Sequence, residues 1–283
     1  MPRPTTRLVR SARSAVKVLA SATVAVAVLA GCSKALDPLS VGLDSDHPGL
    51  AVRRTNVTVG FDADVALALA DRLGYGQGRS LGVPYVSEAD LGASWRSNRL
   101  DFAVALTPMT PANAKVSQLI GPYLSGGQTL AVRADDPRSR AITGPQSLAG
   151  RPVCVAGGAS TMQEGAATHL PSSRIVVRST VSTCLTMLLE GTVDAVTDER
   201  LVLEGYGTVA PYAGKLRVLE PTFTTLDYGL ALPKDQPDLC RRLTRALQGF
   251  VADGEWADAY RRAFVYPGLV DKVPAAPKVT GCS

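Results

Sequence analysis

Residues 148–164 read LAGRPVCVAGGASTMQE, and they decide how the chain folds. The apolar run 153–156 predicts a short buried strand, and the two glycines after it predict where that strand ends. Residues 162–167 are mostly good helix formers, so a helix is expected to follow the glycines. Entry to this helix through Ser160 and Thr161 leaves backbone N–H groups free at the positive end of the helix dipole, where a carboxylate can bind. The same pattern also occurs in ordinary packing of a strand on a helix, so a binding role depends on the rest of the chain.

Residues 1–31 have the features of an export signal. Basic residues precede the apolar run 18–30, which is too short to span a membrane as a helix of the mature protein. The run ends in Leu-Ala-Gly followed by Cys32, which resembles the bacterial lipoprotein box. We therefore predict that Cys32 is lipidated and that 32–39 is a tether on the extracytoplasmic face of the cell membrane. The alternative is a secreted protein that is cut near the same place.

The excess of positive charge belongs to this N-terminal segment. The whole chain has 30 Lys and Arg residues against 25 Asp and Glu residues. Residues 1–31 contain 5 of the basic residues and none of the acidic ones, so the remaining chain carries no net charge. A neutral chain has no general attraction for phosphate backbones, and we expect no nucleic-acid partner.

Four cysteines remain when Cys32 is set aside, and an exported location favours disulfides between them. Of the possible pairings we favour Cys154 with Cys184, because both fall in one strand–helix unit. The other pair is then Cys240 with Cys282, which would tie the end of the chain to a late helix. The sequence has no CxxC spacing, so neither a metal site nor redox chemistry is expected, and no cofactor is implied.

Two stretches of the chain, 97–104 and 189–196, share one layout. Each is the end of a helix, a short turn, an apolar residue followed by Asp, and then a buried strand. This repetition favours two similar α/β lobes over one large sheet.

The predicted lobes are connected by two chain crossings, which allow hinge closure around a ligand. One lobe is expected to contain 40–130 and 226–268, and the other lobe 131–225. The remaining segment, 269–283, is rich in proline and is expected to form an extended tail.

The pattern of apolar residues predicts alternating strands and helices along both lobes. The expected strands are 40–44, 56–59, 82–86, 100–105, 153–156, 174–177, 193–197 and 228–232. The expected helices are 64–73, 89–98, 162–167, 182–190 with Ser182 as its N-cap, and two amphipathic helices around 239–250 and 256–264.

Several motifs together carry a family resemblance. In chain order they are Gly60-Phe61-Asp62-x-Asp64, Thr110-Pro111 with Pro122-Tyr123 downstream, Ser147-Leu148-Ala149-Gly150-Arg151, Gly191-x-Val193-Asp194-Ala195-Val196-x-Asp198 and Gly254-x-Trp256. Over about 40–266 the chain resembles the extracellular solute-binding proteins of the type II periplasmic fold, an α/β Venus-flytrap with two lobes and two hinge crossovers. The most similar subgroup is the glutamine and polar amino-acid binding lipoproteins that serve ABC importers. The resemblance implies a monomer that works with the permease subunits of an importer.

The resemblance also implies roles for particular residues. Asp198 is expected to bind the ammonium group of an amino acid, and the helix start at Ser160 and Thr161 its carboxylate. An ammonium group in a partly dry cleft requires such a paired carboxylate. Asp44 and His47 lie in the loop after the first strand, where an aromatic side chain often covers the ligand. For His47, a plain turn residue is favoured over a ligand contact.

The chain departs from the family pattern where an arginine usually binds the ligand carboxylate. Asn113 stands at that position, and Pro108 stands where a hydroxyl residue would donate a hydrogen bond. Thr107 and Thr110 remain as possible hydroxyl contacts. Glu88 replaces a frequent aromatic and adds an acid to the expected cleft. The ligand is therefore either an ordinary amino acid bound weakly or an amine that has no carboxylate.

These observations favour a lipid-anchored protein that captures an amino acid or a small polar amine and delivers it to an ABC importer. One alternative is a sensing or partner-binding lipoprotein whose amino-acid site has degenerated. A second is an enzyme on the same fold, such as a dehydratase. The sequence contains no GxSxG, HExxH or P-loop motif, so an enzyme is not expected.

Overall fold

The computed structural model describes residues 38–75, 81–158 and 160–282. The predicted signal at 1–31 and the predicted lipidation at Cys32 lie outside the described residues, as does most of the tether. In the part that is described, no helix combines the length and the apolar character needed to cross a membrane.

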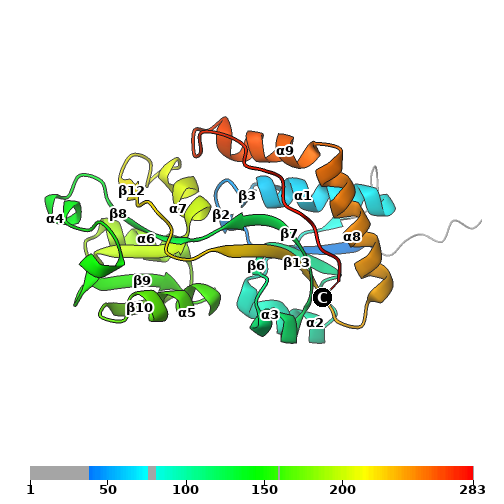
Figure 1. Cartoon of the computed structure of the whole chain (residues 1–283), viewed down its shortest axis with the longest axis horizontal. Helices are drawn as coiled ribbons and strands as arrows, with labels where there is room; N and C mark the ends of the chain where they lie inside the picture. Colours follow the sequence, from blue (N-terminus) through cyan, green and yellow to red (C-terminus); the bar gives the residue numbers. More distant parts are fainter. Residues whose placement is uncertain (1–37, 76–80, 159, 283) are drawn as a thin grey trace, which may run out of the picture. The chain divides into compact units, whose positions relative to one another are not determined.

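The first of two mixed five-stranded sheets has the strand order β5-β1-β6-β13-β7 (Figure 1). Strands β5, β1 and β6 are parallel, and β13 runs antiparallel to β6 and β7. A small sheet, β2-β3-β4, follows β1 in the chain. The bounds are β1 (Leu39–Leu43), β2 (Asp46–His47), β3 (Ala51–Arg54), β4 (Val57–Val59), β5 (Leu81–Gly82), β6 (Phe102–Pro108), β7 (Gln118–Gly126) and β13 (Leu226–Leu232).

The second five-stranded sheet has the order β10-β9-β11-β8-β12. Strand β9 is parallel to β10 and β11, and β8 is antiparallel to β11. Its strands are β8 (Gln128–Arg133), β9 (Pro152–Ala156), β10 (Arg174–Arg178), β11 (Ala195–Glu199) and β12 (Leu216–Val218). The repeated layout at 97–104 and 189–196 ends in β6 and β11. Each of these strands is the third in the order of its sheet, so the repeated segment has the same position in both sheets.

Helices cover both sheets. In Figure 1, α1, α8 and α9 lie on one side of the first sheet and α2 and α3 on the other. Strand β6 is buried along its length, and its alternate residues contribute to two different hydrophobic clusters, as the two-residue period of a strand requires. The helices are α1 (Phe61–Ala70), α2 (Leu91–Arg96), α3 (Pro111–Val116), α4 (Pro137–Arg140), α5 (Ser160–His169), α6 (Val181–Leu189), α7 (Arg200–Gly207), α8 (Pro237–Ala252) and α9 (Glu255–Tyr260).

Three of the sequence motifs meet in the core beside the first sheet. The ring of Phe61 lies 6.1 Å from that of Trp256 and 6.2 Å from that of Tyr123. Trp256 Nε1 donates to the Tyr123 carbonyl at 2.7 Å, and the Tyr123 hydroxyl donates to Asp62 at 3.1 Å. Each aromatic pair contributes about 1 kcal/mol beyond its buried area. These motif residues therefore hold the lobe together and do not form the cleft.

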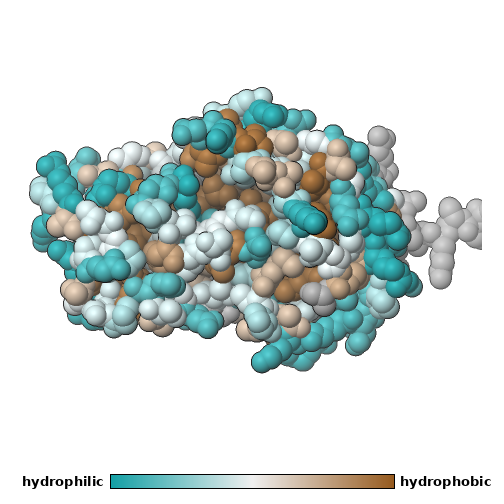
Figure 2. Space-filling view, in the orientation of Figure 1, coloured by the Kyte–Doolittle hydropathy of each residue, from teal (hydrophilic) through white to brown (hydrophobic). Residues whose placement is uncertain are grey.

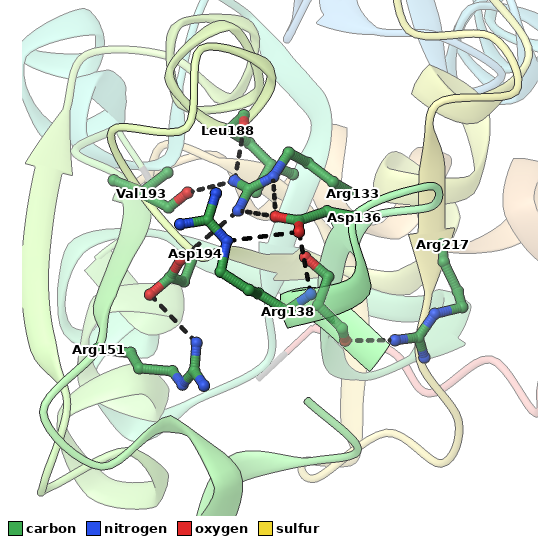
Figure 3. Close-up of polar contacts among 9 residues, drawn as sticks. Arg133, Asp136, Arg138, Arg151, Leu188, Val193, Asp194 and Arg217 are labelled. Atoms are coloured by element: carbon green, nitrogen blue, oxygen red, sulfur yellow. Dashed lines mark hydrogen bonds and ion pairs between the residues drawn. The ribbon is translucent and has the colours of Figure 1, made fainter. Parts of the chain in front are cut away.

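An arginine network holds the second sheet to its helices (Figure 3). Arg133, at the end of β8, donates to the carbonyls of Leu188 and Val193 at 2.9 and 2.8 Å and to the carboxylate of Asp136 at 2.7 Å. Its guanidinium also lies 3.6 Å from Asp194, the aspartate of the repeated layout. The Leu188 carbonyl near the end of α6, which also accepts from Gly191 N at 3.1 Å, thus gains a charged donor.

The chain crosses between the sheets twice, and the crossings contact each other. Strand β7 continues through Gly127 into β8, and the returning chain enters β13 beside it (Figure 1). Gln128 N donates to Thr224 Oγ1 at 2.8 Å across this pair. A Cβ atom on Gly127 would lie 2.1 Å from the Thr224 carbonyl oxygen, so only glycine fits there. Because β8 belongs wholly to the second sheet, the first crossing comes earlier than the predicted lobe boundary after residue 130.

Three predicted elements are shifted or shortened in the structure. The helix predicted at 64–73 begins earlier, at Phe61, because Gly60 with φ of 126° ends the preceding turn. The strand predicted at 82–86 is reduced to β5, with one further bridge at Tyr85. The strand predicted at 193–197 is shifted to β11, which therefore includes Asp198.

The prediction of Ser182 as an N-cap is wrong. Thr180 caps α6, since its backbone is extended and its side chain accepts a hydrogen bond from Thr183 N at 3.2 Å. Ser182 lies inside the first turn of the helix, and its hydroxyl donates to Asp46 instead.

Both disulfides have the pairing that the sequence favours. Cys154 on β9 is bonded to Cys184 on α6, and Cys240 on α8 is bonded to Cys282 in the tail. The tail runs back over the first sheet, where Thr280 N donates to the Gly121 carbonyl. Figure 2 shows many hydrophilic residues at both ends of the face that is drawn, and hydrophobic areas distributed between them.

Candidate functional site

Two adjoining cavities of about 30 Å³ each lie where elements of the two sheets meet. Asp44, His47, Gly158 and Asp198 line both of them. Asp44 follows the end of β1, and Asp198 stands near the end of β11. Ligands of α/β proteins commonly bind at such strand ends. A larger hollow of about 440 Å³ beside α1 is lined by no described acidic residue, and it contains none of the predicted site residues.

Asp198 is a buried acid of the cleft, with 4% of its surface exposed. Its Oδ1 accepts a hydrogen bond from Glu199 N at 2.8 Å. Its Oδ2 is buried and has no hydrogen-bond partner among the described residues. Burial raises the pKa of Asp198 to about 6, although nearby His47 acts in the opposite direction. A buried carboxylate oxygen without a donor is a natural acceptor for a ligand cation.

His47, on β2, is the basic group of the cleft. Its Nε2 lies 3.8 Å from Asp44 Oδ2, and its Nδ1 is buried without a hydrogen-bond partner in the described chain. Burial lowers the pKa of His47, but the carboxylates of Asp44, Asp198, Asp46 and Asp62 together outweigh burial, so the pKa is raised. The sequence favours a turn residue over a ligand contact at His47, whereas its position in both cavities favours the contact.

The helix start at Thr161, which was predicted to bind a carboxylate, binds the carboxylate of Glu88, a residue of the same chain. Thr161 Oγ1 donates to Glu88 Oε1 at 2.7 Å, and Thr161 N donates to Glu88 Oε2 at 3.3 Å. Asn113 Nδ2 donates to the same Oε1 at 3.0 Å and to the Pro108 carbonyl at 2.9 Å. Ser160 is the first residue of α5. Two positions that the sequence associated with the ligand carboxylate, Thr161 and Asn113, thus converge on Glu88.

Two predicted hydroxyl contacts are not brought into the cleft. Thr110 caps α3, where its side chain accepts from Asn113 N at 3.2 Å. Thr107 is fully buried on β6, opposite Gly229 of β13. Neither residue lines the two cavities, because strand pairing and helix capping determine where their side chains lie.

The structure adds two residues to the cleft that the sequence did not indicate as ligands. The Tyr228 hydroxyl donates to Glu199 Oε2 at 2.6 Å, and both residues line the first cavity. Burial raises the pKa of Glu199 to about 7, although the Tyr228 hydrogen bond favours the charged form. The position of Glu199 next to Asp198 in the sequence could have indicated it as a cleft residue. Tyr228 lies in an ordinary predicted strand, and its sequence context gives no such indication.

The two lobes touch directly around the cleft. Asp46 Oδ2 accepts from Ser182 Oγ at 2.9 Å, and the Tyr206 hydroxyl donates to the Asp46 carbonyl. Ala89 N donates to the Gly158 carbonyl at 3.2 Å. The structure is therefore a closed form, and a cavity of 30 Å³ holds only about two water molecules. Within the described ranges, no group of His, Cys, Asp and Glu side chains could hold a metal ion.

Curated relatives of similar sequence are amino-acid binding proteins. The glutamate-binding protein GluB of Corynebacterium efficiens is 28% identical over 229 residues, covering 77% of this chain and 76% of that protein. GluB of Corynebacterium glutamicum is 29% identical over 227 residues, covering 76% and 75%. A glutamine-binding protein of Geobacillus stearothermophilus is 25% identical over 206 residues, covering 73% and 76%.

Solved structures confirm the two-lobed α/β fold. The arginine-, lysine-, histidine-binding protein ArtJ of Geobacillus stearothermophilus superposes with a TM-score of 0.72 at 24% identity, covering 84% of this chain and 97% of that one. The substrate-binding protein AbpA of Streptococcus pneumoniae, solved with L-arginine, gives 0.71 at 25% identity, covering 81% and 95%. The family model of the bacterial extracellular solute-binding proteins, family 3, matches residues 39–266. This match spans most of the chain, which therefore belongs to the family 3 bacterial extracellular solute-binding proteins.

Proposed function

We propose that this chain is a membrane-anchored extracytoplasmic protein that captures an amino acid or a related small polar amine between its lobes and delivers it to an ABC importer. The observation that carries the proposal is Asp198, a buried carboxylate in the cleft between the two lobes, with one oxygen that has no hydrogen-bond partner in the described part of the chain. The relatives named above are glutamate- and glutamine-binding proteins, and both of these ligands carry an amino group, which supports an amine-bearing solute.

The charge of the cleft favours a cationic group. The first cavity is lined by the acids Asp44, Glu88, Asp198 and Glu199, with His47 as its basic residue. Removing a carboxylate from water is costly unless a cation or a hydrogen-bond donor accompanies it. An ammonium group placed beside Asp198 Oδ2 satisfies the buried oxygen and offsets part of the negative charge.

Anchoring and delivery follow from the N-terminal segment and from the family. The lipoprotein box at Cys32 supports attachment to the outer face of the cell membrane through lipid. Curated relatives are binding proteins, which supports a role without catalysis. We propose that the protein acts as a monomer, with importer permease subunits as its partners.

One observation favours a second candidate function. The cleft is closed by the protein's own contacts, Glu88 to Thr161 and Asp46 to Ser182. A sensing or partner-binding lipoprotein with a degenerate site would have such a self-filled cleft. In that case the lobes would bind another protein and the cleft would not capture a solute.

Calorimetric titration of the purified protein distinguishes the two functions. The panel contains glutamate, glutamine, arginine, lysine and the amines agmatine and cadaverine, each at millimolar concentration. We expect saturable binding of one ligand per chain by at least one compound, and loss of that binding in Asp198→Asn. If no compound binds, the transport function is contradicted and the sensing function is favoured.

A further inference from the structure

Glu88 occupies the helix start at Thr161, where the sequence predicts that a ligand carboxylate binds. It belongs to a short helical turn, Glu88–Asp90, on the first lobe, and Thr161 lies in the first turn of α5 on the second lobe. The three hydrogen bonds from Thr161 N, Thr161 Oγ1 and Asn113 Nδ2 measure 3.3, 2.7 and 3.0 Å. A carboxylate at a helix N-terminus is also favoured by the helix dipole. This arrangement resembles the binding of a ligand carboxylate, but both partners are parts of one chain.

The position cannot hold a second carboxylate at the same time. The donors from Thr161 and Asn113 already point at Glu88, and Pro108 has no N–H to offer. Two carboxylates a few ångströms apart in a partly dry cleft repel each other strongly, so both cannot remain ionised. An α-amino acid would therefore have to displace Glu88 before its own carboxylate could bind.

The cation side of the cleft remains available. Asp198 Oδ2 and His47 Nδ1 are buried and have no hydrogen-bond partner in the described chain. Both residues line the same two cavities as Asp44. Glu88 lines only the first cavity, whereas Asp198 and His47 also line the second. Once the lobes open enough to admit a ligand, a protonated amine can therefore reach Asp198 from the side of the second cavity and leave the position of Glu88 occupied.

We infer that Glu88 supplies from within the chain the carboxylate that an amino-acid ligand would supply, so that the cleft selects organic amines or guanidines that have no α-carboxylate. This inference rests on the proposed function and names its class of ligand. Glu88 is then both a contact between the lobes and a specificity residue: it rejects α-amino acids by charge and by occupying their site. Its carboxylate also adds to the negative potential that attracts a cation.

Pairs of ligands that differ only by the α-carboxylate test the inference. Agmatine is compared with L-arginine, and cadaverine with L-lysine, by calorimetry on the purified protein. We expect at least one amine to bind at least about tenfold more tightly than its amino acid, the equivalent of about 1.4 kcal/mol. Tighter binding of the amino acid in both pairs would overturn the inference and leave the proposed function standing. If no compound binds, the proposed function itself fails, and the inference fails with it.

Two substitutions of Glu88 distinguish the effect of its charge from the effect of the space that its side chain fills. Glu88→Ala removes the internal carboxylate, so L-arginine or L-lysine should gain at least about tenfold in affinity while the matching amine loses affinity. Glu88→Gln removes the charge but still fills the position, so the amine should weaken without a comparable gain for the amino acid. An unchanged preference in both variants, each shown to be folded by its circular dichroism and melting temperature, would overturn the inference.

Glu164→Gln is the matched control. Glu164 lies on α5 as Thr161 does, but its side chain is exposed, and it lines neither of the two cavities. The substitution removes the same charge from the same region of the molecule. We expect its ratio of amine to amino-acid affinity to equal that of the unmodified protein. An equal change in Glu164→Gln and Glu88→Gln would show a general effect of charge and overturn the specific role of Glu88.

Discussion

At the scale of single residues, the central feature is the buried Asp198 carboxylate, whose Oδ2 has no hydrogen-bond partner among the residues that the structure describes. Asp198 stands at the end of a buried strand, and Asp44 and His47 approach it from the other sheet. The place of Asp198 near a strand end was predictable from the sequence, because it follows the strand predicted at 193–197, and its expected role came from the family resemblance. The contact of Thr161 with Glu88 was not predictable from the sequence, because it joins residues separated by 73 positions in the chain.

Asp198→Asn should abolish most ligand binding. A neutral amide cannot compensate the charge of a buried ammonium group, and losing such a pair costs about 2–5 kcal/mol, roughly 30-fold to several thousand-fold in affinity. Calorimetry with the tightest ligand of the panel measures the loss. Asp235→Asn, an exposed position, serves as the control and should bind normally. Equal affinity of Asp198→Asn and the unmodified protein would contradict the assignment.

The buried acids also predict how stability depends on pH. Burial raises the pKa of Asp62 to about 7, of Glu199 to about 7 and of Asp198 to about 6. Each folded-state pKa lies above its unfolded value, so the folded state binds more protons between about pH 4 and 7. The free energy of unfolding of the ligand-free protein should therefore fall as the pH rises through this range, by about 1.4 kcal/mol for each unit of pKa difference.

Urea unfolding at pH 5, 6, 7 and 8 measures this dependence. Asp62→Asn should reduce the slope, because it removes one of the titrating acids and lies outside the two cavities. A free energy of unfolding that rises from pH 5 to 7, or a slope that Asp62→Asn leaves unchanged, would show that these acids do not titrate as described.

At the scale of elements, the unit of β9, a glycine turn and α5 was predictable because its pattern is local. The apolar run, the two glycines and the hydroxyl residues all act on their immediate neighbours. The first residue of α6 was less predictable, because both Thr180 and Ser182 can cap a helix. The contact that decides between them joins Ser182 to Asp46, 136 positions away. Local pattern locates the helix, and a distant contact determines its first turn.

Thr180→Ala should destabilise the fold more than Ser182→Ala does. Thr180 caps α6, and the loss of a threonine cap costs about 1 kcal/mol. Ser182 keeps its place in the first turn and loses only its hydrogen bond to Asp46 across the cleft. Urea unfolding of both variants gives the comparison. A larger loss of stability in Ser182→Ala would restore Ser182 as the cap.

At the scale of the whole molecule, closure of the lobes depends on a tight approach between α7 and the turn after β2. A Cβ atom on Gly205 would lie 1.8 Å from the Pro48 carbonyl oxygen, whereas one on Gly207 would meet nothing within 4 Å. The first position faces the other lobe and the second does not. The sequence predicted two lobes and two crossings, but not which glycine lies between the closed lobes.

Gly205→Ala should hold the lobes apart without unfolding them. Alanine favours the helix over glycine by about 1 kcal/mol, so the stability of α7 should not fall. We expect a larger radius of gyration in small-angle scattering and weaker ligand binding. Gly207→Ala has the same helical gain and should show neither change. Identical scattering and affinity for the two variants would contradict the closed contact.

A crystal structure of the protein grown with agmatine tests the central claim most directly. The account predicts that a nitrogen of the ligand lies within hydrogen-bond distance of Asp198 Oδ2, while Glu88 keeps its contacts with Thr161 and Asn113. A ligand bound away from Asp198, or one whose entry displaces Glu88 from α5, would contradict it.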